Sequence, residues 1–247
     1  MKWYLSIILL VIPFLLLADP VYLGNGQNDV SVLVSNAKET VLQYNIGHFN
    51  AHKIEIGTRQ WHHLALPGEG VTQVKGEPEL PVYNRSIIIP SASAMSLEIY
   101  DLHWEDIELA IAPSKGIITR DQTPDLIPYT FSDTYTRDEF YPHSIASLSE
   151  PYILREFRGI TIQTTPFAYN PISGILRVYT AYKVRVSASG TDYRNLLSGE
   201  RSFVSRDFLP IYENHFLNWD SERYTPVSDS FGKLLVICHT NYMTTIA

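Results

Sequence analysis

The 247-residue sequence contains a single cysteine, Cys238. A lone cysteine excludes disulfide bonds within the chain, so side-chain packing must stabilise the fold. An excess of positive charge is also missing: 19 Lys and Arg stand against 26 Asp and Glu, the formal net charge is -7, and the basic residues form no run. We therefore expect no nucleic acid as a partner, because binding to a phosphate backbone depends on clustered basic side chains.

Motifs of common catalytic and metal sites are missing as well. The sequence has neither a glycine-rich phosphate loop nor a G-x-S-x-G nucleophile motif. His48 and His52 stand four residues apart, but no glutamate accompanies them as in a zinc-peptidase motif, and their context is strand-like. His62 and His63 would point to opposite faces of a strand, so they could not share a metal ion. From these patterns we expect no catalytic residue, cofactor or metal ion, and a binding or regulatory module is favoured.

Alternation of apolar and polar residues is the dominant pattern that is present. It is longest in "LRVYTAYKVRV", residues 176–186. One face of this segment carries Leu176, Val178, Tyr182, Val184 and Val186, and the other carries Arg177, Lys183 and Arg185. A period of two over this length predicts a strand that covers a core on one side only.

Further strands are expected from the same signal. Ile160 and Ile162 share a face, Pro166 marks a break or an edge, and "NPISG" at 170–174 has the residues of a reversing loop, which predicts a β-hairpin. Shorter alternating segments lie at 30–35, 52–57, 85–90 and 96–102. Together with 16 Tyr, 15 Pro and 13 Gly, these segments predict an all-β fold of the β-sandwich type.

The two ends of the chain differ from this β-rich centre. The N-terminus carries one positive charge, an apolar stretch at 3–17, and then Ala18 before Asp19. This layout predicts a secretory signal peptide cut between Ala18 and Asp19, and no membrane attachment after the cut; an uncleaved anchor is the alternative. After Gly190 the alternation weakens, which predicts a partly helical or irregular segment that leads to an exposed linker at 221–230.

Four segments carry a resemblance to a known family. They are "VKGEPELPVYNRSIIIPSASAMSLEIY" at 74–100, "APSKGIITR" at 112–120, "ILREFRGITIQTTPFAYNPISGILRVYT" at 153–180 and "RYTPV" at 223–227. Together they resemble the propeptide of the gingipain-type cysteine peptidases, over most of the chain after the signal peptide. The spacing of "GEPELPV" and "ILREFRG" is more specific than either motif alone.

The resemblance implies a division of the chain into three parts. Residues 1–18 are the signal peptide, 19–223 are a β-sandwich prodomain, and 224–247 are a linker followed by the first strand of an α/β catalytic domain. The implied function is to keep the peptidase latent and to assist its folding until the chain is cut between Arg223 and Tyr224. The implied partner is the cognate cysteine peptidase domain in cis, and the chain is either part of a longer secreted protein or a separate module.

The catalytic His and Cys of the implied peptidase lie downstream of that first strand. Cys238 and His239 do not correspond to them, and as neighbours on a strand they would point apart rather than act as nucleophile and base. No residue of this chain is therefore expected to be catalytic, and whether the missing catalytic domain prefers Arg or Lys stays open.

Latency requires a basic side chain that fills the peptidase's primary specificity pocket as a substrate would. Two loop residues fit this requirement, Lys115 in "PSKG" and Arg120 in "ITRD". Lys115 is preferred because Pro113 and Gly116 indicate a turn around it, and Arg120 is second. A solvated loop lysine without this role is the simpler reading.

A competing function is that of a secreted adhesion or glycan-binding module. Sugar binding would require exposed aromatic side chains, whereas the aromatic residues at 167–169, Tyr179 and Tyr182 are expected in the core or on sheet faces.

Overall fold

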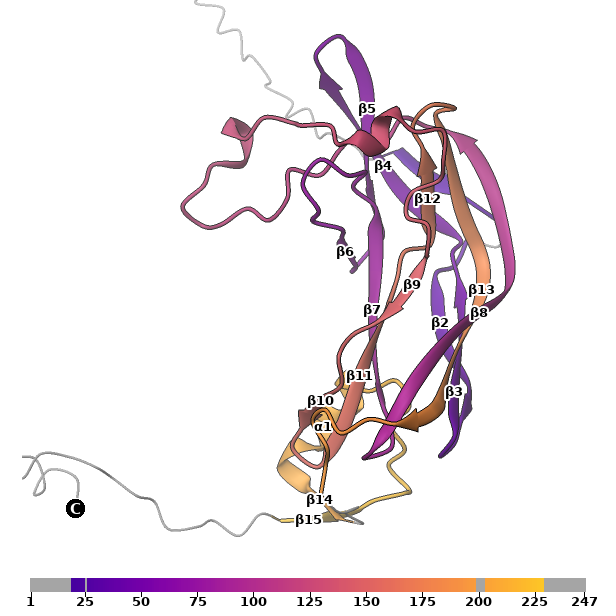
Figure 1. The fold of residues 1–247 in the computed structure, drawn as a ribbon, viewed down its shortest axis with the longest axis vertical. Coiled ribbons are helices and arrows are strands. Elements are labelled where there is room, and N and C mark those ends of the chain that lie inside the picture. Colours follow the sequence, from indigo (N-terminus) through magenta and orange to yellow (C-terminus); the bar gives the residue numbers. More distant parts are fainter. Residues whose placement is uncertain (1–18, 25, 199–202, 229–247) are drawn as a thin grey trace, which may run out of the picture.

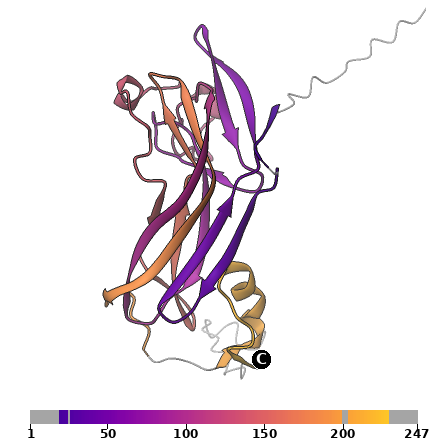
Figure 2. The same ribbon diagram turned by 90° about the vertical axis from the view of Figure 1, so that its right-hand side faces the viewer.

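The computed structural model describes residues 19–24, 26–198 and 203–228. Its main body is a sandwich of two five-stranded sheets, as the two views in Figures 1 and 2 show. The all-β fold expected from the sequence is confirmed.

The first sheet is entirely antiparallel. It consists of β2 (Asp29–Ser35), β3 (Glu39–Asn45), β8 (Ser93–Glu108), β12 (Phe167–Asn170) and β13 (Ile175–Thr191). The order is β12-β13-β3-β2, and β8 pairs with β13 along the whole length of that strand. The hairpin predicted around "NPISG" is the β12–β13 pair, in which Asn170 stands opposite Ile175.

The second sheet faces the first across the core. It consists of β6 (Gly70–Val71), β7 (Pro81–Ile88), β9 (Ala146–Leu148), β10 (Tyr152–Leu154) and β11 (Phe157–Thr164). The order is β10-β11-β7-β6, with β9 paired to β11. Pro166 lies between β11 and β12, where the chain leaves the second sheet and enters the first.

Two smaller sheets flank the sandwich. The three-stranded sheet consists of β1 (Asp19–Tyr22), β4 (His48–Ile56) and β5 (Arg59–Ala65) in the order β1-β4-β5. The two-stranded sheet is parallel and joins β14 (Phe203–Ser205) to β15 (Thr225–Val227).

Burial of the core follows the predicted alternation on β13. Its five inward side chains, Leu176, Val178, Tyr182, Val184 and Val186, are all 0% exposed. The outward basic residues form cross-strand ion pairs, Arg177 with Asp106, Lys183 with Asp101, and Arg185 with Glu98 and Glu39. The sequence therefore identified both faces of this strand, and its basic face is neutralised within the sheet.

The aromatic residues considered for sugar binding lie inside the protein. Phe167, Tyr169 and Tyr182 are 0% exposed, and Tyr179 packs against the same core. The preference for a core role over a glycan-binding role is confirmed for these residues.

A second, smaller cluster covers the outer face of β11 at one end of the sandwich. It is built around η3 (Arg206–Phe208) and α1 (Leu209–His215), which lie opposite the β4–β5 end in both views (Figures 1 and 2). The buried members are Phe157, Val204, Tyr212 and Phe216. A Cβ on Gly159 would lie 2.7 Å from a ring carbon of Phe216, so only glycine allows this close approach.

Some predictions fall on residues that the structure does not describe. The signal peptide at 1–18, including Ala18, and the expected first strand of a catalytic domain after 228 lie outside the described residues. Asp19, the other side of the predicted signal cleavage, is the first residue of β1 and pairs with Lys53 at 3.2 Å. Among the described helices, none is long and apolar enough to cross a membrane.

Candidate functional site

The long connection between β8 and β9 projects from the β4–β5 end of the sandwich (Figure 1). It contains η1 (Pro124–Leu126) and η2 (Asp133–Thr136), and we call residues 115–131 the projecting loop. Four large apolar side chains on this loop are exposed: Ile117 at 74%, Ile118 at 36%, Leu126 at 81% and Phe131 at 44%. Exposed apolar side chains gathered on one loop are typical of a contact surface.

Residues 74–79 hold the base of the projecting loop. The Gly76 N–H donates to the Ser114 carbonyl at 2.9 Å, and the Ser132 N–H donates to the Gly76 carbonyl at 3.0 Å. Gly76 has a φ of +86°, and a Cβ there would lie 3.2 Å from the Ser132 nitrogen. The "GEPELPV" and "APSKG" motifs are thus neighbours in space, and one glycine joins the two ends of the loop.

We expect Gly76→Ala to lower the free energy of unfolding by about 2–3 kcal/mol. A left-handed backbone costs an alanine about 1–2 kcal/mol, and the new methyl group would also press on the backbone of Ser132. Gly68→Ala is the matched control, because its φ is +79° and no atom lies within 4 Å of the added Cβ. Urea unfolding measures both; equal losses would show that the loop base does not crowd Gly76.

Side chains of β5 fasten the projecting loop to the sandwich. The Trp61 and Phe131 rings lie 5.0 Å apart between centroids. His63 Nε2 lies 2.9 Å from the Tyr129 hydroxyl, and its Nδ1 lies 2.8 Å from Glu79 Oε1. Burial, with the Glu79 charge as a second cause, raises the pKa of Tyr129, whose hydroxyl lies within hydrogen-bonding distance of His63.

Lys115, the preferred candidate from the sequence, points back into its own loop. Its Nζ donates to the Pro124 carbonyl at 2.8 Å and lies 4.4 Å from the centroid of the Tyr129 ring. The side chain is partly buried. To enter a partner's pocket, this lysine would first have to give up both contacts.

Arg120, the second candidate, is presented outward. The Gln122 N–H donates to the Thr119 carbonyl at 3.1 Å, and the Thr119 N–H donates to Gln122 Oε1 at 3.0 Å, so Arg120 occupies the corner of a doubly fixed turn. Its side chain is exposed and forms no hydrogen bond or ion pair with any residue that the structure describes. Arg120 is therefore better placed to reach a partner than Lys115, and which of the two enters a partner's pocket stays a prediction.

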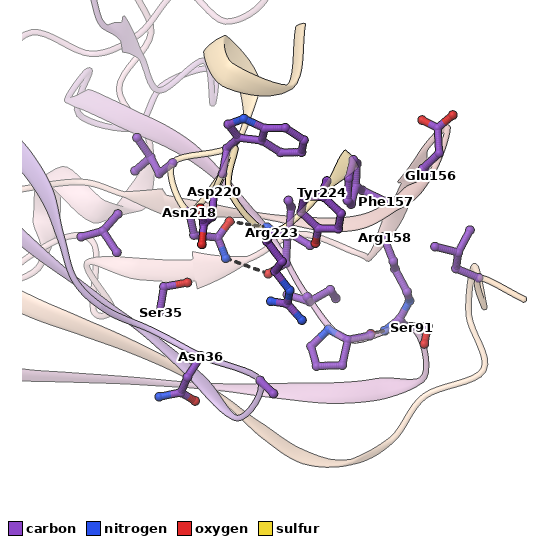
Figure 3. Close-up of a pocket in the computed structure, with 18 residues that line it drawn as sticks. Ser35, Asn36, Ser91, Glu156, Phe157, Arg158, Asn218, Asp220, Arg223 and Tyr224 are labelled. Carbon is purple, nitrogen blue, oxygen red and sulfur yellow. Dashed lines mark hydrogen bonds between the residues drawn. The ribbon is translucent and has the colours of Figure 1, made fainter. Parts of the chain in front are cut away.

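The predicted processing site lies at the other end of the molecule, beside α1 (Figures 1 and 3). Arg223 is exposed and lines a cavity of about 650 Å³, together with residues of β7, β11 and the segment 217–220. Tyr224 is partly buried against the second cluster. The predicted boundary between Arg223 and Tyr224 thus lies directly before a residue that packs against the second cluster.

No group of three or more His, Cys, Asp or Glu residues could hold a metal ion among residues 19–24, 26–198 and 203–228. His48 and His52 both lie on β4, which is the strand context expected of them. Cys238 and His239 lie outside the described residues.

The sequence analysis missed one residue that organises the end of the sandwich near the predicted processing site. Arg158 on β11 has a side chain that is 0% exposed. It donates to five backbone carbonyls, those of Pro90, Ser93, Asp192, Arg194 and Asn195. The only signal in the sequence was an arginine inside the apolar run of a strand, and the "EFRG" motif proves to be structural.

Comparison with known proteins decides the family. The Propeptide_C25 family model matches residues 22–208. The chain belongs to the Propeptide_C25 family. The resemblance to gingipain-type propeptides is therefore confirmed, and the chain is a propeptide of this type in its fold and its sequence.

Curated relatives of this propeptide are gingipains of Porphyromonas gingivalis. Gingipain R2 is 38% identical over 177 residues, which are 70% of this chain and 24% of the relative. Gingipain R1 is 36% identical over 221 residues, which are 88% of this chain and 22% of the relative. Lys-gingipain is more distant, at 19% identity over 202 residues, 77% of this chain and 11% of the relative. The chain spans about a quarter of the length of the gingipain R relatives.

Solved structures agree with the fold. The propeptide superposes on a chain from the complex of the RgpB pro- and mature domains of Porphyromonas gingivalis with a TM-score of 0.69 and 30% identity, covering 77% of this chain and 98% of that one. A structure described as giving insight into the zymogenic latency of gingipain K from the same organism matches with a TM-score of 0.61 and 15% identity, covering 70% of this chain and 100% of that one. The second match shows the shared fold alone.

Proposed function

We propose that this propeptide keeps a gingipain-type cysteine peptidase domain latent, with Arg120 in the primary specificity pocket of that domain. The observation that carries the proposal is the contrast on the projecting loop: Lys115 is tied back, whereas Arg120 stands exposed on a fixed turn. A chain that superposes on this one comes from the complex of the RgpB pro- and mature domains, which supports the choice of partner.

Rigidity separates an inhibitor from a substrate in this proposal. A loop that is already ordered loses little conformational entropy on binding, and so binds tightly. The projecting loop is fixed at its base by Gly76 and near its C-terminal end by the contacts of Trp61 with Phe131 and of His63 with Tyr129. After an accidental cut these contacts would hold the two new ends together, which favours resealing or retention over release.

The apolar side chains beside Arg120 supply the remaining contact area. Ile117 and Leu126 are 74% and 81% exposed and lie on the same loop. Apolar anchors around one charged group are the usual composition of the central part of a protein–protein interface. These two residues are proposed to pack on the rim of the pocket that takes Arg120.

Three further parts of the proposal concern export of the chain, folding of the peptidase domain and separation of the two. The chain is exported by a signal peptide cut between Ala18 and Asp19, it assists folding of the peptidase domain, and it is separated from that domain by cleavage between Arg223 and Tyr224. Exposure of the Arg223 side chain supports the last step. No membrane and no nucleic acid takes part.

The direct test is inhibition in trans. We expect the chain from Asp19 onward to inhibit the mature domain of gingipain R2 competitively against a short arginine reporter substrate, with an inhibition constant below about 1 μM. The mature domain of Lys-gingipain, whose propeptide is more distant, should bind more weakly. Inhibition that does not compete with the reporter, or no inhibition of either enzyme, would contradict the proposal.

A further inference from the structure

Tyr224, the residue after the proposed cut, is held by aromatic rings from two other segments. Its ring stacks on Trp219 with centroids 5.2 Å apart and an interplanar angle of 14°. The same ring meets Phe157 edge-on at 4.9 Å, and Phe157 meets Trp219 edge-on at 5.3 Å. We call Phe157 and Trp219 the aromatic site; both residues line the cavity drawn in Figure 3.

The chain on both sides of the Arg223–Tyr224 bond is also fixed by its backbone. Downstream, β15 pairs with β14, so that Thr225 stands opposite Phe203. Upstream, the Arg223 N–H donates to the Asp220 carbonyl at 3.3 Å. The bond itself therefore lies between a turn and a short parallel ladder.

The aromatic site is itself anchored to the sandwich. Phe157 belongs to β11, and the Asn218 side chain, next to Trp219, bonds both backbone groups of Ile88 on β7, at 2.7 Å to the nitrogen and 3.0 Å to the oxygen (Figure 3). The Asn218 side chain thus takes the place of a neighbouring strand's backbone at the edge of the second sheet.

We propose that the aromatic site is a docking surface for the segment 224–227, and that docking protects the bond after Arg223 from proteolysis. An endopeptidase binds its substrate as an extended strand, with residues on both sides of the bond in its own subsites. A docked Tyr224 is unavailable for this, so cleavage proceeds only from the fraction of molecules in which the segment has detached. The inference rests on the proposed processing at Arg223, and it adds a second barrier that is separate from Arg120.

Limited proteolysis of the full chain by an unrelated arginine-specific endopeptidase tests this without the cognate enzyme. The initial rate of cleavage after Arg223 is measured by mass spectrometry, and the rate after Arg120 in the same molecule serves as internal reference. We expect Trp219→Ala to raise the Arg223 rate about tenfold and to leave the Arg120 rate unchanged. The two sites lie at opposite ends of the molecule, so a selective effect is meaningful (Figure 1).

Two further variants make the outcome decisive. Trp104→Ala removes a tryptophan that is 51% exposed on β8, and it should change neither rate. Tyr224→Ala should accelerate cleavage after Arg223 by about the same factor as Trp219→Ala, once corrected by the rates of short peptides with either residue after the arginine. Unchanged Arg223 rates in both variants would overturn the proposal. A general rise at both sites would do so as well, because it would reveal unfolding instead of undocking.

Failure of the latency proposal would be seen elsewhere. A chain that does not inhibit any mature domain, yet shows selective acceleration at Arg223, would refute the role of Arg120 and leave the aromatic site standing.

Discussion

Arg120→Ala is expected to weaken inhibition of the gingipain R2 mature domain about 100-fold or more. A charged side chain that fills a specificity pocket at the centre of an interface is a typical hot spot, and its truncation leaves the pocket's own charge buried without a partner. The inhibition constant, measured by titration against an arginine reporter, gives the result directly. The fold should be intact, because the Arg120 side chain is exposed and has no partner among the described residues.

The neighbouring lysine is the natural control. Lys115→Ala removes one bond to the Pro124 carbonyl and one cation–ring contact with Tyr129, both at an accessible position. Such contacts are weak, so inhibition should fall less than about fivefold. Arg120→Lys should lie between the two, at about tenfold, because an ammonium cannot reproduce the planar fork of a guanidinium. A larger loss for Lys115→Ala than for Arg120→Ala would restore the order that the sequence suggested.

The preference for Arg120 over Lys115 could not be obtained from the sequence, for a physical reason. The turn residues around Lys115 are local, and they correctly indicate a bend. What decides the direction of the side chain is the Pro124 carbonyl and the Tyr129 ring, which lie 9 and 14 residues further along an irregular loop. Neither alternation nor turn chemistry predicts how such a loop closes on itself.

Strands were predictable where burial is one-sided. On β13 five apolar residues of one face are buried and the other face carries ion pairs, so most of the strand's sequence alternates and both faces were identified. The pattern is weaker on β11 because both of its faces are covered near Gly159, one by the sandwich core and the other by Phe216. A strand covered on both sides need not alternate.

The end of the molecule that carries the predicted processing site was the least predictable part. Its aromatic site joins Phe157 to Trp219 and Tyr224, which are more than sixty residues further along the chain. The expected exposed linker is indeed exposed at 221–223, but Tyr224 is drawn into the cluster. Contacts between such distant, non-periodic residues leave no local signal, and the junction after Arg223 was predicted only from the resemblance to a family.

Arg158→Met is expected to give the largest loss of stability of any substitution considered, about 3–5 kcal/mol. All five N–H groups of the wild-type guanidinium donate to backbone carbonyls of two connecting segments, 90–93 and 192–195. Both segments therefore depend on one side chain. Methionine fills a similar volume but donates nothing, and each carbonyl left buried without a donor costs about 1–3 kcal/mol unless water replaces the arginine. A loss of this size is a large fraction of the stability of a typical domain.

Arg194→Met is the matched control for that experiment, because the Asp192 carboxylate, which lies 3.4 Å from the buried Arg158 guanidinium, is also contacted by Arg194 from the surface. Its side chain is 63% exposed, and it pairs with Asp192 at 3.1 Å and with Glu150 at 3.2 Å. Exposed pairs of this kind contribute about 0–1 kcal/mol, so its urea midpoint should shift only slightly at an unchanged m-value. Equal midpoints for the two variants would mean that the carbonyls around Arg158 find other donors. A selective loss in Arg158→Met would show that the "EFRG" arginine holds together the end of the sandwich on which the Arg223–Tyr224 bond is docked.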